Sequence, residues 1–154
     1  GFYLTDPNEV DSIPSTRRLH TKTLAEFSYR VIAPAGWEAQ LASDDWAQLA
    51  ALPWIGTSPA SAHHRLLANI FARHGCQQKT VALVDHEASM LEMVRSGVGL
   101  SLCRESIALH ERQSFGLTVC EGLRVPACLL IIALEDRMKD PVVAALFEQV
   151  QKVW

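Results

Sequence analysis

The chain has few of the features that define several large classes of protein. It contains no apolar run near the roughly 18 residues of a membrane span, and its main apolar run covers Cys128–Leu134. Its net charge is −3, and Arg17 and Arg18 are its only adjacent basic residues. Because nucleic-acid binding requires Lys and Arg clustered against phosphates, we do not expect this chain to bind DNA or RNA by itself.

Cysteine is also sparse and unpatterned. Four cysteines occur, without CxxC spacing, at positions 76, 103, 120 and 128. Cys103, Cys120 and Cys128 lie in or beside apolar segments, where a reduced thiol behaves as a small hydrophobic group. No secretory signal precedes them. We therefore predict reduced, buried thiols, no disulfide framework and a cytoplasmic location.

Catalytic and metal-binding patterns are missing as well. Ser101 lacks the GxSxG context of a nucleophile elbow, and no Ser/His/Asp or Cys/His set is visible. His63 and His64 are neighbours on a predicted helix and point about 100° apart, so they cannot readily share an ion. The Gly97-Val-Gly99 segment follows a helix and precedes a strand, the reverse of a dinucleotide-binding turn. The sequence predicts no enzyme, no metal and no cofactor.

What the chain does contain is an alternation of strand-like and helical segments. Hydrophobic residues make up 49% of the sequence, which is enough to build a core. Ser58-Pro59 and Asp140-Pro141 each place a capping side chain before a proline at the first helical position. Strands are expected near 17–21, 25–33, 53–57, 80–84, 98–103, 117–120 and 128–134, and helices near 43–51, 58–75, 87–96, 105–112 and 141–154. This order predicts an α/β fold with a mostly parallel sheet.

Residues 84–103 are the most informative segment. Met90, Leu91 and Val94 fall at helical spacing, and Gly97 suits the left-handed turn that ends a helix. A strand end, a short helix and a second strand in this order form a β-α-β unit. Ligands bind at the C-terminal strand ends of parallel sheets built from such units. The segment therefore predicts a binding cleft without supplying catalytic groups.

Proline-marked junctions near Pro34 and Pro126 divide the chain. Residues 34–124 form a self-contained run of strands and helices. The flanking segments, 1–33 and 125–154, are too incomplete to form a domain alone, so we expect them to pair with each other. A lobe that is entered and left through two crossing segments is typical of hinged, two-lobed binding proteins.

Several short motifs also occur in a characteristic order and spacing. They are Gly1-Phe-Tyr-Leu4, Val31-Ile-Ala-Pro34, Trp46–Ala50 with Pro53-Trp-Ile55, Ser61–Gly75, Val84-Asp85, Met90–Val94, Ser96–Leu102 and Asp140-Pro-Val142. Over essentially its whole length, the chain resembles the C-terminal regulatory domain of LysR-type transcriptional regulators. Each motif is weak alone, and the set is what carries the resemblance.

The resemblance implies a type 2 periplasmic-binding-protein-like fold, in which two α/β lobes hold an effector between them. Residues 34–124 would be the complete second lobe. Residues 1–33 and 125–154 would be part of the first lobe. The N-terminal part of that lobe, and the winged helix-turn-helix that precedes it in the family, would be missing. The expected function is to sense a small anionic metabolite, to form a dimer or tetramer in the full-length protein, and to signal to DNA-binding domains. The alternative is an extracytoplasmic solute-binding protein of a transporter, which shares the fold.

The candidate effector contacts are Thr57, Ser58, Ser61 and Asp85. The turn from Thr57 to Ser61 offers hydroxyls and the free N–H groups of a helix start, which suit a carboxylate. The alternative is a plain capping turn in which Ser58 satisfies its own helix. Asp85 begins the sequence Asp85-His-Glu87, which we interpret as a helix cap with a cleft-facing polar edge rather than an acid/base cluster.

The candidate dimer contacts are Met90, Met93 and Val94. They form a second apolar face on the predicted helix 87–96, and in the family this helix is expected to meet a partner chain. The alternative is that all three side chains belong to the core.

Overall fold

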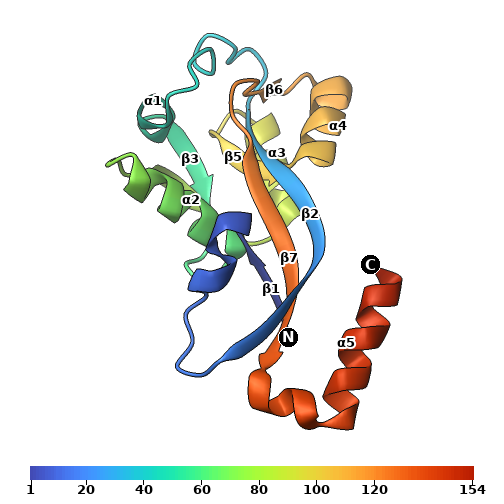
Figure 1. Ribbon diagram of the computed structural model, residues 1–154. Coiled ribbons are helices and arrows are strands. Elements are labelled where there is room, and N and C mark those ends of the chain that lie inside the picture. Colours follow the sequence, from blue (N-terminus) through green and yellow to red (C-terminus); the bar gives the residue numbers. More distant parts are fainter. The chain divides into compact units, whose positions relative to one another are not determined.

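The computed structural model describes residues 1–154, which divide into two compact units. One unit joins Gly1–Phe27 to Pro126–Trp154, and the other is Ser28–Val125 (Figure 1). The sequence placed these boundaries at 33/34 and 124/125. In the structure the first division falls after Phe27, inside strand β2 (Leu19–Ala33), and the second differs by one residue. The last residues of β2, Val31–Ala33, are completely buried and pair with strands of the second unit.

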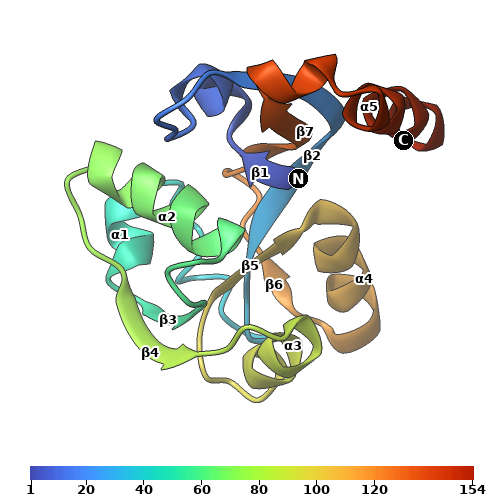
Figure 2. The same cartoon turned by 90° about the horizontal axis from the view of Figure 1, so that it is seen from below.

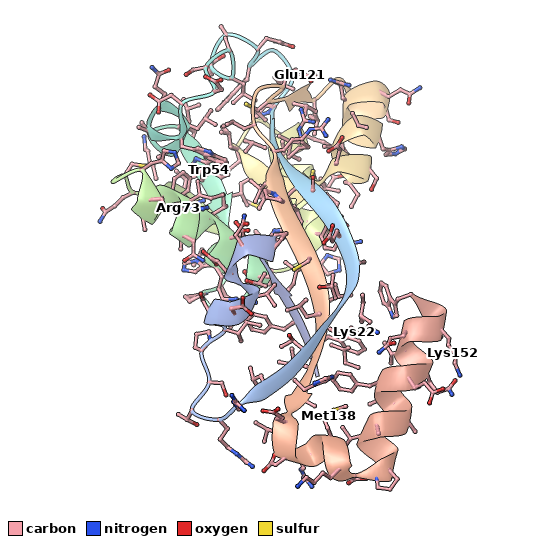
Figure 3. The ribbon with its side chains drawn as sticks, viewed as in Figure 1. Lys22, Trp54, Arg73, Glu121, Met138 and Lys152 are labelled. Carbon is pink, nitrogen blue, oxygen red and sulfur yellow. The ribbon has the colours of Figure 1, made fainter.

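The first unit contains strands β1 (Phe2–Thr5) and β7 (Val125–Leu134), the beginning of β2, and helix α5 (Pro141–Val153). Short 3-10 helices cover Pro7–Ser12 and Glu135–Lys139. The predicted start of α5 is confirmed, since the Asp140 carboxylate accepts from the Val142 N–H and Pro141 is the first helical residue. Lys22 of β2 reaches α5, where its Nζ donates to Gln151 Oε1 at 2.6 Å (Figure 3).

The second unit contains the remaining elements (Figure 2). In chain order they are α1 (Trp46–Ala50), β3 (Pro53–Gly56), α2 (Ala62–Arg73), β4 (Lys79–Leu83), α3 (Glu87–Arg95), β5 (Ser101–Arg104), α4 (Glu105–Phe115) and β6 (Thr118–Val119). None of the helices in either unit has the length and apolar character needed to cross a bilayer.

The prediction of mostly parallel sheets is wrong for most strand pairs. β3 pairs with β4 in parallel, and Trp54 of β3 forms a parallel bridge with Leu100. By contrast, β5 and β6 both run antiparallel to β2, and β1 runs antiparallel to β7. Each antiparallel pair includes β2 or β7. The sequence identified these strands as crossing segments but did not predict their directions. The parallel β3–β4 pair lies in the β-α-β part of the second unit.

Two groups of side chains form the core of the second unit. Trp54 packs edge-on against Phe71 of α2, and its indole N–H donates to Leu49 O at 2.8 Å. The other group lies around α3, and its buried members are Ile32, Ile55, Met90, Leu91, Val94, Cys103, Ala108, Leu117 and Val119. The cysteines are free thiols, and Cys103, Cys120 and Cys128 are buried as predicted.

Candidate functional site

A cavity of about 400 Å³ opens between the beginnings of α2 and α3 in the second unit. Its polar lining comes from the segment after β3 and the segment after β4, the two neighbouring strands that run in parallel. Because the ends of parallel strands meet at one sheet edge, residues far apart in the sequence share this space. The lining residues are Thr57, Ser58, Ala60, Ser61, Ala62, His63, Val84, Asp85, His86, Glu87 and Met90. All four predicted effector contacts are among them.

Ser61, not Ser58, caps helix α2. The Ser61 hydroxyl accepts from the His64 N–H at 3.1 Å and also shares a hydrogen bond with the Thr57 hydroxyl. The helix begins at Ala62, so Pro59 lies in the turn that precedes it. The predicted capping role of Ser58 is therefore wrong. Ser58 instead closes that turn with its carbonyl, which accepts from the Ser61 N–H at 2.9 Å.

Asp85 joins the two segments that line the cavity. Its Oδ1 accepts from the Ser58 N–H at 2.8 Å, across 27 residues of sequence. The residue at the N-cap of α3 is His86, which makes no side-chain capping bond. The predicted capping role of Asp85 is wrong, because its carboxylate is used in this tertiary contact. Its predicted place at a polar edge agrees with its position in the cavity lining.

Acids and histidines are the ionisable side chains that line the cavity. Asp85 and Glu87 are the acids, and no Lys or Arg is present. Oδ1 of Asp85 is bonded to Ser58, whereas the Glu87 carboxylate makes no hydrogen bond or ion pair within the chain. The ring of His63 packs edge-on against Tyr29 at 4.8 Å. Burial, with a smaller effect from Arg104, lowers the pKa of His63, so its neutral form is favoured.

The backbone supplies the positive character of the cavity. The first N–H groups of an α-helix have no partner within the helix, and those of Ala62 and His63 begin α2 beside the cavity. Together with the helix dipole, they favour a negatively charged group near the start of α2. One side of the cavity therefore suits an anion, and the side formed by Asp85 and Glu87 suits hydrogen-bond donors or a cation.

The structure places the predicted dimer contacts inside the protein. Met90 and Val94 are 2% and 0% exposed in the core around α3, and Met93 is partly buried against the same group. The cluster that holds them also contains Ile55 of β3, Cys103 of β5 and Ala108 of α4. Side chains with so little exposed surface cannot form the main contact with a partner, so the core alternative fits these residues better.

Sequence reasoning did not list His63 or Glu87 as candidate effector contacts, although it expected the Asp85-His-Glu87 segment to present a polar edge to the cleft. Both occupy the first turn of a helix that follows a strand of the parallel pair. That position could have identified them, because first-turn side chains border the sheet edge where ligands bind.

Comparison with known proteins identifies a family for this chain. The family model for the LysR substrate binding domain matches residues 9–154. A search among curated proteins gives no significant match.

Solved structures share the fold at low sequence identity. The regulatory domain of CcmR from Synechocystis PCC6803, in complex with 2-PG, is 15% identical with a TM-score of 0.71; the alignment covers 99% of this chain and 72% of that one. The effector binding domain of QuiR in complex with shikimate is 17% identical with a TM-score of 0.66, covering 99% and 70%. Full-length CbnR complexed with its target DNA is 14% identical with a TM-score of 0.64, covering 98% and 51%.

Proposed function

Because the chain belongs to the LysR substrate-binding domain family, we propose that it senses a small metabolite for a LysR-type transcriptional regulator and binds it in the cavity between α2 and α3. The observation that carries this proposal is the convergence of Thr57, Ser58, Ser61 and Asp85 on one space of about 400 Å³. A cavity of this size falls within the usual range for small-molecule sites. The lining residues can bind a ligand, but none of them is positioned as an activated nucleophile. We therefore expect binding without catalysis.

The start of α2 supports a carboxylate on the effector. The N–H groups of Ala62 and His63 are available there, and the Thr57 hydroxyl is held beside them by its bond to Ser61. Backbone donors at a helix N-terminus bind anions well because their direction is fixed before the ligand arrives. No Lys or Arg lines the cavity, so these backbone groups would be the main partners of the carboxylate.

Asp85 and Glu87 support a second kind of group on the same effector. A molecule with only carboxylates would bring like charges close to them, which is unfavourable in a partly enclosed space. Hydroxyls or an ammonium group would instead donate to these oxygens. The proposed effector is therefore a small organic acid that also carries hydroxyl or amino groups.

We further propose that effector binding is relayed to DNA-binding domains elsewhere in the regulator, and that the regulator acts in the cytoplasm. The relay requires that the effector bind one arrangement of the protein better than another. A full-length member of the family has been solved with its target DNA. The net charge of −3 on this chain agrees with a role in which other residues contact DNA.

Self-association is the last part of the proposal, and it needs a surface other than Met90 and Val94. Strand β4 offers one, since β3 is its only partner in a two-stranded sheet. Val81 and Leu83 on this strand are 48% and 67% exposed. An unpaired strand edge with exposed apolar side chains favours association with another chain.

Substitution of Thr57 by Val tests the site. Val has nearly the same shape and removes the hydroxyl, so we expect affinity for small hydroxylated or amino carboxylic acids to fall at least about tenfold. A thermal-shift screen would identify binding acids, since a bound ligand raises apparent stability, and calorimetry would then compare the variants.

The matched control is Thr23→Val, on an exposed position of β2, which should leave affinity unchanged. Equal affinity of the wild type and Thr57→Val would remove this cavity as the site. A chain that binds none of the acids would count against effector sensing itself.

A further inference from the structure

A second, much smaller cavity lies between α2, β3 and β5. Its volume is about 10 Å³, and Thr57 and His63 line it as well as the larger cavity. The other lining residues are Ile55, Gly56, His64, Leu67, Gln78, Ser101 and Leu102. We call this space the inner chamber. It has room for one small group at most, because a single water needs roughly 10–15 Å³.

Two polar atoms in the inner chamber are buried and have no hydrogen-bond partner in the protein. They are the hydroxyl oxygen of Ser101 and the side-chain nitrogen Nε2 of Gln78. Ser101 is 1% exposed, at the first position of β5. An unpaired buried polar group destabilises a fold, so buried polar atoms nearly always have partners.

We propose that the inner chamber is a binding site for one ordered water molecule. The water oxygen would accept from Nε2 of Gln78 and could donate a hydrogen to, or accept one from, the Ser101 hydroxyl. The chemistry of the lining fits a neutral oxygen better than an ion. It includes a serine hydroxyl, an amide and two histidines, but no acidic side chain and no Lys or Arg.

The water site also gives Ser101 a role, namely to bind the water, which the residues around it in the sequence do not indicate. Ser101 sits opposite Ile32 in the β2–β5 pair, in a row of otherwise apolar buried residues. A water between Ser101 and Gln78 would connect β5 to the segment that leads into β4. It would also lie directly behind Thr57 and His63, and so form part of the wall of the effector pocket. Only this last consequence rests on the proposed function.

Water-selective NMR on the isotope-labelled full chain tests the proposal without a ligand. We expect cross-peaks between water and the Gln78 side-chain amide protons, with the NOE and ROE signs of a long-lived bound water. Ser101→Val should abolish them, because its methyl groups fill the space and the hydroxyl is lost. The control Ser114→Val, at an exposed position of α4, should keep them. Persistence of the cross-peaks in Ser101→Val would overturn the proposal.

A high-resolution crystal structure of the wild-type chain gives an independent answer if Ser101→Val does not fold. We expect an oxygen within the roughly 2.7–3.2 Å of a hydrogen bond from both Ser101 Oγ and Gln78 Nε2. A dry chamber, or a direct bond from Ser101 Oγ to another protein atom, would overturn the water site. Either outcome is independent of whether a carboxylic acid binds in the larger cavity.

Discussion

At the scale of single residues, Asp85 has both a structural and an electrostatic effect on the proposed site. Its Oδ1 holds the Ser58 N–H and thereby fixes the turn before α2. Its charge faces the same cavity in which we propose that a carboxylate binds. The two effects can be separated, because an amide oxygen accepts a hydrogen bond as a carboxylate oxygen does but carries no net charge.

Asp85→Asn should therefore keep the turn and change the charge preference of the cavity. We expect acids without an amino group to bind several-fold more tightly to the variant, and amino acids to bind less tightly. Calorimetry with an amino acid and the corresponding 2-hydroxy acid measures both changes. Asp44→Asn, on a residue outside the cavity, is the control. Parallel changes for the two ligands would show that charge at Asp85 does not select between them.

His63 should make the stability of the fold depend on pH. Burial lowers its pKa in the folded chain, so the unfolded chain binds the proton more readily below its ordinary pKa of about 6.5. The stabilising effect of the neutral ring is complete above that pH and is lost as the pH falls from about 6.5 toward the lower pKa of the folded state.

His63→Phe removes this titration while keeping an aromatic ring beside Tyr29. We expect the urea midpoint of the wild type to fall more between neutral and mildly acidic pH than that of the variant. The exposed His110 of α4 provides the control His110→Phe, whose pH profile should follow the wild type. Identical slopes for the wild type and His63→Phe would contradict the assignment.

At the scale of helices and strands, local signals were sufficient where the partners are neighbours in sequence. Asp140-Pro141 predicted the start of α5 because the cap and the N–H that it binds are two residues apart. The start of α2 was placed three residues too early, because both Ser58 and Ser61 are good caps. In the structure Ser61 caps the helix, while Asp85 from another segment binds the Ser58 N–H. No pattern around Ser58 contains that information.

The close contact between β3 and the segment before β5 gives a second example. A Cβ atom added at Gly99 would lie 2.3 Å from the carbonyl oxygen of Pro53. Both neighbouring backbone bonds, Leu100 N to Pro53 O and Ile55 N to Leu100 O, measure 2.8 Å. The sequence suggested only that Gly97-Val-Gly99 is not a nucleotide-binding turn, and the packing explains why glycine is needed at position 99.

Gly99→Ala should consequently lower the free energy of unfolding by about 3 kcal/mol, since neither backbone segment can move without breaking these bonds. Gly116→Ala is the control: its φ is +68° with open space around it, so only about 1 kcal/mol of backbone strain is expected. Urea denaturation monitored by tryptophan fluorescence measures both. Equal destabilisation by the two substitutions would contradict the close-packing argument.

At the scale of the whole molecule, the family fold could be predicted, but strand direction and exposed surface could not. The order of strands and helices follows from hydrophobic spacing within each segment. The antiparallel pairing of β5 and β6 with β2 depends on where distant segments meet. In the same way, Met90 and Val94 have the spacing of an apolar face, but the sequence does not say whether that face meets the core or a partner.

The exposed edge of β4 gives the last prediction, which concerns assembly. If two copies associate through this edge, light scattering coupled to size exclusion should show a mass that rises with concentration toward twice the 17.0 kDa of the chain. Replacing Val81 and Leu83 by Glu places charges on the edge, which opposes strand pairing between chains, and should hold the mass at that of one chain.

The control for this experiment is Leu109→Glu, on α4, where the side chain is 41% exposed but lies on a helix and offers no unpaired strand. It should associate like the wild type, because its added charge is remote from β4. Association that survives the double substitution would exclude the β4 edge. Loss of association in the control alone would place the contact on α4 instead, and either result would still leave Met90 and Val94 in the core.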